Sequence, residues 1–426
     1  MSTAILRFNK RTFLSLRRYR NYRLFFAGQV VSVTGTWMQN VASAWLIVQL
    51  THSSFQVGIL ALAQFLPFTL FGLFAGTIVD RINARRLVIG TQIVQMAIAS
   101  ALAAVALLGV VTPWMVFLAA FGRGAVLVLD APARQALTYR MVGRAELPNA
   151  VALNSSLFNA SRVLGPALGG VVIAVAGTGV CFAFNAVSFL AVLAGLLAMR
   201  EADLFPVERR ERPTILRGTR EGLRWVWADR QVRTILIVVL VVSTFGFNMN
   251  VVLPLLASDT LHAGPRTFGL VSACFGLGAL AGALFAASLS RASGKVLLGG
   301  TGLFGLFELG LAPLHSTVGA CALLFLIGAS FTTWTSNSNT GIQLQAPDHL
   351  RGRVVGLYYY AFNGTGPLGG LLAGWLCAVG GTELAFAVAG AATVAATIYG
   401  ASALAAVQSG SGRVREPAPS DEPIAA

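Results

Sequence analysis

The segment Phe55–Val111 reads FQVGILALAQFLPFTLFGLFAGTIV-DRINARR-LVIGTQIVQMAIASALAAVALLGVV. Its two apolar stretches flank a short loop that carries one aspartate and three arginines. Each stretch exceeds the roughly 20 residues that an α-helix needs to cross a hydrocarbon core of about 30 Å. Strands of an outer-membrane barrel would instead alternate apolar and polar residues over segments of about 10 residues. The segment therefore predicts two membrane-spanning helices joined by a polar turn.

The same alternation of apolar stretches and polar loops continues through all 426 residues. Hydrophobic residues make up 56% of the chain and charged residues only 11%, whereas soluble domains carry about 25% charged residues. We therefore expect an all-α integral membrane protein of twelve transmembrane helices in two six-helix halves. The expected helices are Leu24–Leu50, Phe55–Val79, Leu87–Val111, Trp114–Ala133, Ala150–Ala174, Val180–Met199, Thr234–Leu256, Phe268–Leu289, Val296–Leu314, Val318–Ser338, Val354–Ala378 and Leu384–Val407.

The loops on the two sides of the expected membrane differ in charge. Basic residues fill the amino-terminal segment, the long middle loop and every other short loop, whereas the loops of the opposite side carry only Arg266. The positive-inside rule makes the basic side cytoplasmic, and both termini lie on that side. Because this topology accounts for the net charge of +15, we expect no nucleic-acid partner.

The chain divides into five regions: a cytoplasmic segment (1–20), a six-helix half (21–199), a cytoplasmic middle loop (200–231), a second six-helix half (232–407) and a disordered tail (408–426). The stretch RVLGPALGG at Arg162–Gly170 recurs as NGTGPLGG at Asn363–Gly370, which indicates duplicated halves. Many transporters place a substrate path between two such halves. Within the middle loop, REGLRWVWADRQ is expected either to lie along the membrane surface or to be a solvated linker.

The loop GTIVDRINARR resembles the cytoplasmic-loop signature of the major facilitator superfamily. Gly76, Asp80, Arg81, Arg85 and Arg86 fit that pattern, although asparagine and alanine replace the second glycine and one basic residue. GPALGG in the expected fifth helix resembles the antiporter motif of the superfamily, which marks exporters more than importers. The expected fourth helix lacks the usual Arg-x-x-Gln-Gly of the superfamily.

Three further stretches look like the transmembrane secretion effector branch, which includes enterobactin exporters and relatives of macrolide efflux pumps. They are VSVTGTWMQ, DAPARQA (Asp130–Ala136) and ELPNAVALNSS (Glu146–Ser156). The resemblance covers roughly residues 10–405. It implies the major facilitator fold and a location in the bacterial inner membrane.

The resemblance also implies a cytoplasmic gate formed by Gly76, Asp80, Arg81, Arg85 and Arg86. In this gate Asp80 faces the start of the eleventh helix, whose free N–H groups favour a carboxylate. The alternative is that the arginines only anchor the topology.

Two Gly-Pro sequences are expected to bend helices and to let them pack closely, because proline removes a backbone donor and glycine lacks a side chain. The residues of this helix-packing motif are Gly165, Pro166, Gly169 and Gly170 in one half, and Gly366, Pro367, Gly369 and Gly370 in the other.

Ionisable side chains within the expected spans are Arg123, Asp130, Arg162 and Glu308. Such residues are costly in hydrocarbon and tend to be paired or to line a cavity. We expect at least one of the two arginines to line a central cavity and to meet an anionic or hydrogen-bond-accepting substrate. Alternatively, one of them forms a structural pair with Asp130.

Proton coupling requires a deep carboxylate, and Asp130 and Glu308 are the candidates. Glu308 is favoured because its own helix offers no basic partner, although a permanently protonated carboxyl is the alternative. Polar side chains also cluster in spans, and we expect these residues, with one tryptophan among them, to line the cavity: Gln39, Asn40, Asn154, Asn159, Asn248, Asn250, Trp334, Asn337 and Asn363.

The sequence thus predicts a proton-driven exporter of a small organic molecule, siderophore-like or drug-like, that works by alternating access. A neutral or anionic substrate is favoured because the first helix has no acidic residue. An importer of a nutrient or lipid with the same fold is the alternative. No pattern of an enzyme or of a metal site is present, and the four cysteines all lie in apolar stretches. We expect a monomer in the bilayer, with protons as coupling ion and no cofactor.

Overall fold

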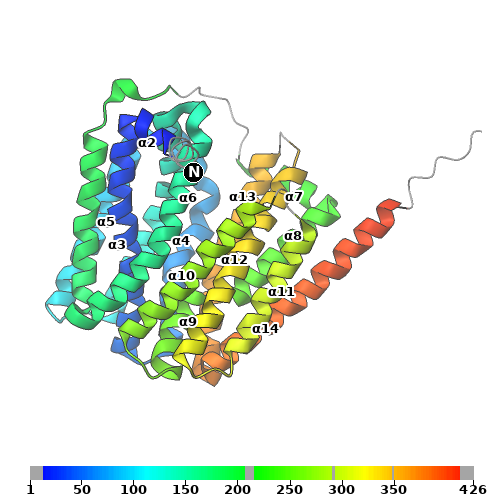
Figure 1. The fold of residues 1–426 in the computed structure, drawn as a ribbon. Helices are drawn as coiled ribbons and strands as arrows, with labels where there is room; N and C mark the ends of the chain where they lie inside the picture. The colour runs from blue at the N-terminus through cyan, green and yellow to red at the C-terminus, as the bar shows by residue number, and fades with distance from the viewer. Residues whose placement is uncertain (1–12, 207–214, 290–292, 348–349, 413–426) are drawn as a thin grey trace, which may run out of the picture.

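The computed structural model describes residues 13–206, 215–289, 293–347 and 350–412, and in these ranges it contains helices and no strand. Figure 1 shows two bundles side by side, one formed by the first half of the chain and one by the second. The first contains α2 (Leu14–Arg18), α3 (Arg20–Thr51), α4 (Ser54–Arg81), α5 (Ala84–Leu107), α6 (Pro113–Leu197) and η1 (Glu201–Asp203).

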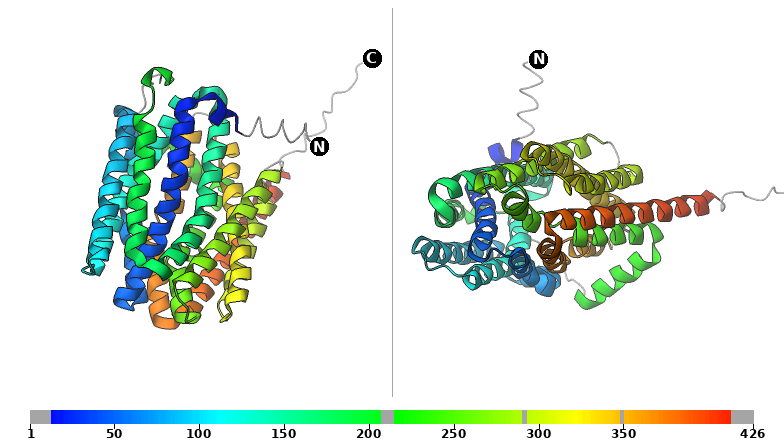
Figure 2. Two further views of the ribbon diagram at one scale, coloured as in Figure 1. Left: turned by 60° about the vertical axis from the view of Figure 1, so that its left-hand side comes forward. Right: turned by 90° about the horizontal axis from the view of Figure 1, so that it is seen from below.

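The second bundle begins with the amphipathic α7 (Ile215–Ala228) and continues through an irregular stretch. This stretch consists of α8 (Arg230–Val241), the π-helix η2 (Val242–Gly246), α9 (Met249–Leu255) and a second π-helix, η3 (Leu256–Thr260). It is followed by α10 (Pro265–Ser288), α11 (Gly294–Leu311), α12 (Thr317–Gln345), α13 (Arg351–Asn363) and α14 (Gly366–Gly412). The right-hand view of Figure 2, from below, shows the same division of the molecule into two groups of helices.

The two longest helices are interrupted at glycines. α6 leaves helical geometry at Gly143 (φ 68°) and Gly177 (φ 82°), and α14 does so at Gly380 and Gly381 (φ 69°). Positive φ values are accessible to glycine because it has no Cβ. α6 therefore consists of three helical segments and α14 of two. In the described residues, eight helices are long and apolar enough to cross a membrane when each interrupted helix is counted once.

Turns at the two ends of the molecule carry different residues. One end holds α2, the turn at Asn83, η1 and the start of α13, and we call it the arginine-rich end. There Arg20 donates to the carbonyl of Ala198, and Arg353 pairs with Glu221 of α7. At the opposite end Thr260 contacts Thr382. In the described residues, the absence of strands and the eight long apolar helices confirm the expectation of an α-helical membrane protein.

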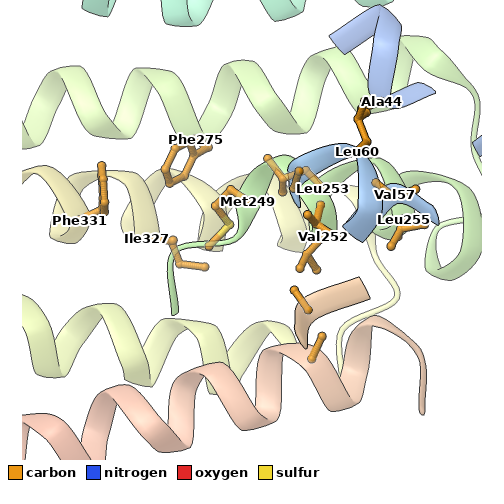
Figure 3. Packing of buried hydrophobic residues seen from close by; sticks show 14 of the residues in the cluster. Ala44, Val57, Leu60, Met249, Val252, Leu253, Leu255, Phe275, Ile327 and Phe331 are labelled. Carbon is orange, nitrogen blue, oxygen red and sulfur yellow. The ribbon is translucent and has the colours of Figure 1, made fainter. Parts of the chain in front are cut away.

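The two bundles touch through helix backbones. A Cβ on Gly170 of α6 would lie 2.8 Å from Cα of Gly269 of α10, and a Cβ on Gly58 of α4 would lie 2.7 Å from the carbonyl oxygen of Gly370 of α14. Apolar side chains fill the space beside these contacts. Figure 3 shows Leu60 of α4 near residues of α9, and the two elements belong to one buried cluster.

Candidate functional site

A pocket of about 820 Å³ lies between the two bundles. Its walls come from α3, α4 and α6 of the first bundle, and from α9, α10 and the break before α9 in the second. Among its polar lining residues are Asn40, Gln64, Arg123, Arg162 and Asn250. No acidic side chain lines it in the described part of the chain. The pocket is therefore basic, and both bundles supply residues to its lining.

Arg123 is held in this pocket by the close packing of α6 against α4. A Cβ on the neighbouring Gly124 would lie only 2.2 Å from the carbonyl oxygen of Gln64, so glycine is what permits the approach. The Nη2 atom of Arg123 donates to Oδ1 of Asn40 at 2.9 Å. Its Nε is buried and has no partner among the described residues. A fixed guanidinium with unused donors is suited to bind an acceptor group.

Arg162 lies inside a cage of aromatic rings that we call the aromatic cage. Its Cζ is 4.9 Å from the ring centre of Phe275, 5.3 Å from Phe331, and 5.8 Å from both Trp37 and Phe247. Three of these rings belong to the second bundle, whereas Arg162 belongs to the first. Cation–π attraction therefore joins the bundles at the level of the pocket.

The described residues offer Arg162 no hydrogen bond and no ion pair. Its guanidinium carbon lies among the rings, and the guanidinium carries five N–H donors. An anionic or carbonyl-bearing ligand in the pocket could accept these donors bidentately.

Asp130 takes part in a separate network within the first bundle. Its carboxylate, 1% exposed, pairs with Nε of Arg134 at 2.5 Å and accepts from Thr91 (2.5 Å) and Gln92 (2.9 Å). Arg134 also donates to Gln29. The partner of Asp130 in the structure is therefore Arg134, and the arginines that line the pocket have other surroundings.

Glu308 of α11 lies in a smaller pocket of about 310 Å³ inside the second bundle. Its side chain is fully buried, and its Oε1 has no partner among the described residues. The hydroxyl of Thr393 on α14 lies 3.5 Å from Oε2. A third pocket of about 420 Å³ is lined by Asn248, Asn250 and Asn363, and it shares Asn250 with the central one.

The remaining polar residues expected in the cavity lie elsewhere. Each makes contacts within its own bundle: Gln39 with Asn185, Asn154 with the hydroxyl of Tyr22 (3.0 Å), Asn159 with the carbonyl of Ser155 (3.0 Å), and Asn337 with the carbonyl of Thr333 (2.9 Å). Trp334 is fully buried beside the aromatic cage, with its ring centre 6.0 Å from that of Phe331. The structure therefore brings Asn40, Arg123, Arg162 and Asn250 together in the central pocket.

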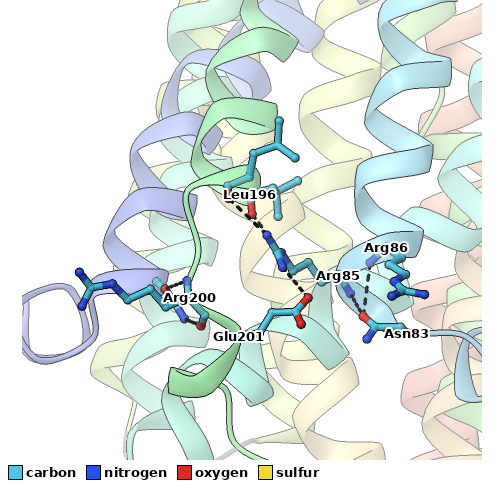
Figure 4. A network of polar contacts seen from close by, with 8 residues as sticks. Asn83, Arg85, Arg86, Leu196, Arg200 and Glu201 are labelled. Atoms are coloured by element: carbon cyan, nitrogen blue, oxygen red, sulfur yellow. Dashed lines mark hydrogen bonds and ion pairs between the residues drawn. The ribbon is translucent and has the colours of Figure 1, made fainter.

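The expected gate loop contains a network confined to the first bundle (Figure 4). The Nη1 atom of Arg85 pairs with Glu201 at 2.6 Å, and its Nε donates to the carbonyl of Leu196 at 3.0 Å. Arg85 thus caps the end of α6, where free carbonyls favour a cation. Asn83, in turn, caps the start of α5 by accepting from the backbone N–H of Arg85 at 3.0 Å and from that of Arg86 at 3.4 Å.

Four further residues belong to the expected gate: Gly76, Asp80, Arg81 and Arg86. Arg81 and Arg86 are exposed. The side-chain environments of Gly76 and Asp80 lie outside the part of the chain that the structure describes.

Glycines of the expected packing motif lie at helix contacts. A Cβ on Gly165 would lie 2.3 Å from Cβ of Trp37, and one on Gly369 would lie 2.5 Å from the carbonyl oxygen of Thr244. The sites of Gly366 and Gly370 are similarly close to α4, and Pro166 lines the central pocket. A Cβ on Gly169 would make only ordinary contacts of 3.4–3.6 Å with α3. Since Trp37 belongs to the aromatic cage, the motif also sets the position of one cage wall.

Sequence reasoning missed the aromatic cage. Trp37, Phe247, Phe275 and Phe331 are separated widely along the chain, and aromatic residues are common in membrane helices. The only local signal was the Gly246–Asn250 stretch, in which a glycine and two asparagines interrupt an apolar span.

Two helical bundles that enclose a basic pocket form the architecture of a secondary transporter. The chain belongs to the transmembrane secretion effector family of the major facilitator superfamily, whose model matches residues 12–421. It is therefore a multi-pass transporter of the bacterial inner membrane and not an enzyme, as expected from the sequence.

Relatives of the chain include transporters of several kinds. The multidrug efflux pump Tap of Mycolicibacterium fortuitum is 30% identical over 83% of this chain and 88% of its own length. The staphyloferrin A transporter of Staphylococcus aureus is 25% identical over 88% of this chain and 94% of its own length. The macrolide efflux protein A of Streptococcus pyogenes is 24% identical over 66% of this chain and 71% of its own length.

Solved structures support the fold. The nucleoside transporter NupG superposes with a TM-score of 0.68 at 14% identity, over 90% of this chain and 98% of that one. A bacterial homologue of the iron transporter ferroportin, in its inward-facing state, gives a TM-score of 0.67 at 16% identity, over 90% of this chain and 98% of that one. At these identities the likeness concerns the fold alone, and it confirms the major facilitator architecture.

Proposed function

We propose that this chain is a proton-driven exporter of a small organic molecule that is neutral or anionic, and that it works by alternating access. The observation that carries the proposal is the central pocket, in which Arg123 and Arg162 meet no acidic side chain. A cationic substrate would be repelled there, whereas an acceptor group would gain charge-assisted hydrogen bonds. The names of the relatives, which include drug efflux pumps and a siderophore transporter, support export and a siderophore-like or drug-like substrate.

The proposed topology has twelve crossings and both termini in the cytoplasm. The crossings are α3, α4, α5, the three segments of α6, the stretch from α8 to η3, α10, α11, α12, α13 with the first part of α14, and the remainder of α14. In this topology the arginine-rich end is cytoplasmic, in agreement with the positive-inside rule. The halves are residues 21–199 and 232–407, as the sequence predicts.

Alternating access is supported by the position of the contacts between the bundles. Ser54 donates to Asp259 at 3.4 Å near the end of the molecule opposite the arginine-rich end. Tyr360 donates to the carbonyl of Thr69, near the middle of α4, at 2.9 Å. The described hydrogen bonds between the bundles thus lie between the middle of the molecule and the end opposite the arginine-rich end. We infer that the structure is closed toward the outside, and that rocking of the bundles about the central pocket exposes it there.

Proton coupling is assigned to Glu308. Asp130 is the other deep carboxylate, but its pairing with Arg134 within one bundle gives it a structural role. Glu308 has no basic neighbour among the described residues and retains an unpartnered oxygen. A carboxyl in such surroundings can bind a proton without breaking an ion pair.

Efflux into everted membrane vesicles tests the proposal. A panel of siderophores, macrolides and cationic dyes is offered with the pH gradient intact and with the gradient collapsed. We expect gradient-dependent accumulation of a neutral or anionic compound. Accumulation of cationic dyes alone would contradict the charge argument. Transport seen only in right-side-out vesicles would favour the importer.

A further inference from the structure

The seventh crossing is broken where it passes between the Glu308 pocket and the central pocket. The π-helix η2 ends at Gly246, and Phe247 (ψ 64°) and Asn248 (φ −117°, ψ 34°) are not helical before α9 begins. Irregular backbone at membrane depth is tolerated where it lines a cavity, and single π-turns occur frequently at functional sites. The break therefore marks a place where polar groups and space coincide.

Asn248 and Glu308 are the only polar side chains that line the Glu308 pocket in the described structure. Asn248 also lines the third pocket, together with Asn250 and Asn363. That pocket in turn shares Phe247 and Asn250 with the central pocket. The three pockets thus follow one another, and Asn248 is the polar residue shared by the Glu308 pocket and the third pocket.

The side chain of Asn248 is fixed by the break itself. Its Nδ2 donates to the carbonyl of Thr244 at 2.8 Å, which satisfies a carbonyl freed by the π-helix. Its Oδ1 accepts no hydrogen bond from any described group, so it is available to a water molecule. An amide oxygen held in this way can orient a water that bridges toward a buried carboxyl.

Gly246 gives the carboxyl of Glu308 its access to the break. A Cβ at this position would lie 2.8 Å from Oγ1 of Thr393, 3.0 Å from the ring of Phe304 and 3.4 Å from Oε2 of Glu308. Only glycine leaves the space between the carboxyl and the backbone of η2 free. Among the described residues, Glu308 is therefore the carboxyl group beside the break, and Arg162 lies on the other side of it, against the ring of Phe247.

We propose that the break at Phe247–Asn248 is the route by which protons travel between the central pocket and Glu308, with Asn248 as the positioning residue for the bridging water. In the forward step the water held by Asn248 gives a proton to the Glu308 carboxylate, which becomes a neutral acid. That water regains a proton along other water molecules from a hydronium ion in bulk solvent, which is left as water. The proposal rests on the proposed proton coupling and adds a route and a residue to it.

A proton fits this site better than a metal ion. Hard cations such as calcium take about six to eight oxygen ligands, whereas the lining of the Glu308 pocket is apolar apart from the two residues named. No charged side chain from η2, α9, α12 or α14 faces the carboxyl in the described chain. The nearest elements carry Asp259 and Glu383 only at the opposite end, where Glu383 pairs with His315 at 2.9 Å.

Infrared spectroscopy of the purified full-length protein tests the route directly. Acid-induced difference spectra show the carboxyl C=O band, and its absence from Glu308→Gln assigns that band to Glu308. Transfer into deuterated buffer then gives the rate at which the assigned carboxyl exchanges its proton. We expect exchange in the wild type, slowed about tenfold in Asn248→Leu, which corresponds to ~1.4 kcal/mol in the barrier. Asn248→Ser, which keeps an oxygen, should exchange at a rate close to that of the wild type.

An Asn248→Leu protein that exchanges as fast as the wild type would overturn the route. So would a wild-type Glu308 that does not exchange, a result that needs no variant at position 248. The proposed function fails on a different result, namely wild-type efflux that is indifferent to the pH gradient. Thermal unfolding of each variant shows whether the fold is retained.

Discussion

Replacement of Arg162 by methionine provides the sharpest test of the central pocket. Methionine fills similar apolar space between the rings of Phe275 and Phe331, which lie 4.9 and 5.3 Å from the guanidinium carbon. The substitution removes the positive charge and all five N–H donors. Because Arg162 has no hydrogen bond or ion pair within the described chain, no protein acceptor is left unsatisfied. The direct loss therefore concerns the ligand and the aromatic cage.

The size of the effect follows from the kind of bond that is lost. Hydrogen bonds to charged groups contribute about 1.5–3 kcal/mol net, which corresponds to a weakening of about 10- to 150-fold in Kd. The cation–π contacts, worth about 0.5–2 kcal/mol, are lost in the variant whichever substrate is offered. An anionic substrate should therefore lose affinity by about one to two orders of magnitude, whereas its neutral ester should lose much less.

The assay is efflux into everted vesicles with one anionic substrate and its methyl ester, measured at several concentrations to separate KM from the maximal rate. We expect Arg162→Met to raise KM for the anion selectively. Arg162→Lys, which keeps the charge but not the planar fork, should fall in between. An equal loss for the anion and the ester would refute the reasoning, because the arginine would then only join the two bundles.

Three further perturbations test neighbouring features. Gly269→Val places side-chain atoms against backbone at less than 3 Å, so we expect the outside-closed state to lose about 1–3 kcal/mol and transport to fall, as measured by accessibility labelling and efflux. Tyr360→Phe removes a hydrogen bond between the bundles and should shift the same labelling, whereas Tyr358→Phe, whose hydroxyl bonds Thr335 within one bundle, should not. Thr393→Val should alter the pH profile of efflux by removing the hydroxyl beside Glu308, whereas Thr397→Val, one turn away on the same helix, should leave it unchanged.

The fold was largely predictable because hydropathy and loop charge act over short ranges of sequence. The expected helix Phe55–Val79 lies within α4, and Leu87–Val111 nearly coincides with α5. Prediction was weaker where the helix is interrupted within one continuous apolar stretch of sequence. The expected helix Thr234–Leu256 runs in fact through α8, η2 and α9. The backbone is not helical between Gly246 and Met249, beside Glu308.

The candidate site was predictable only as far as composition allows. A charged residue in an apolar span must have a reason to be there, so Arg123, Arg162 and Glu308 could be selected from the sequence. Their neighbours could not be selected, because the rings around Arg162 come from α3, α10, α12 and the break before α9. Helical periodicity fixes which residues share a face, but not which faces of distant helices meet.

The position of Arg162 suggests how ligand binding and rocking can be linked. Its guanidinium, anchored in the first bundle, is attracted by rings of the second, so the cation–π contacts favour the arrangement in the structure. An anionic ligand that accepts its N–H donors would compete with the rings for the same charge, and the contact between the bundles would weaken. A ligand shifts a conformational equilibrium only by its differential affinity for the two states. The exchange of ring contacts for a bound anion would supply such a difference at the point where the bundles meet.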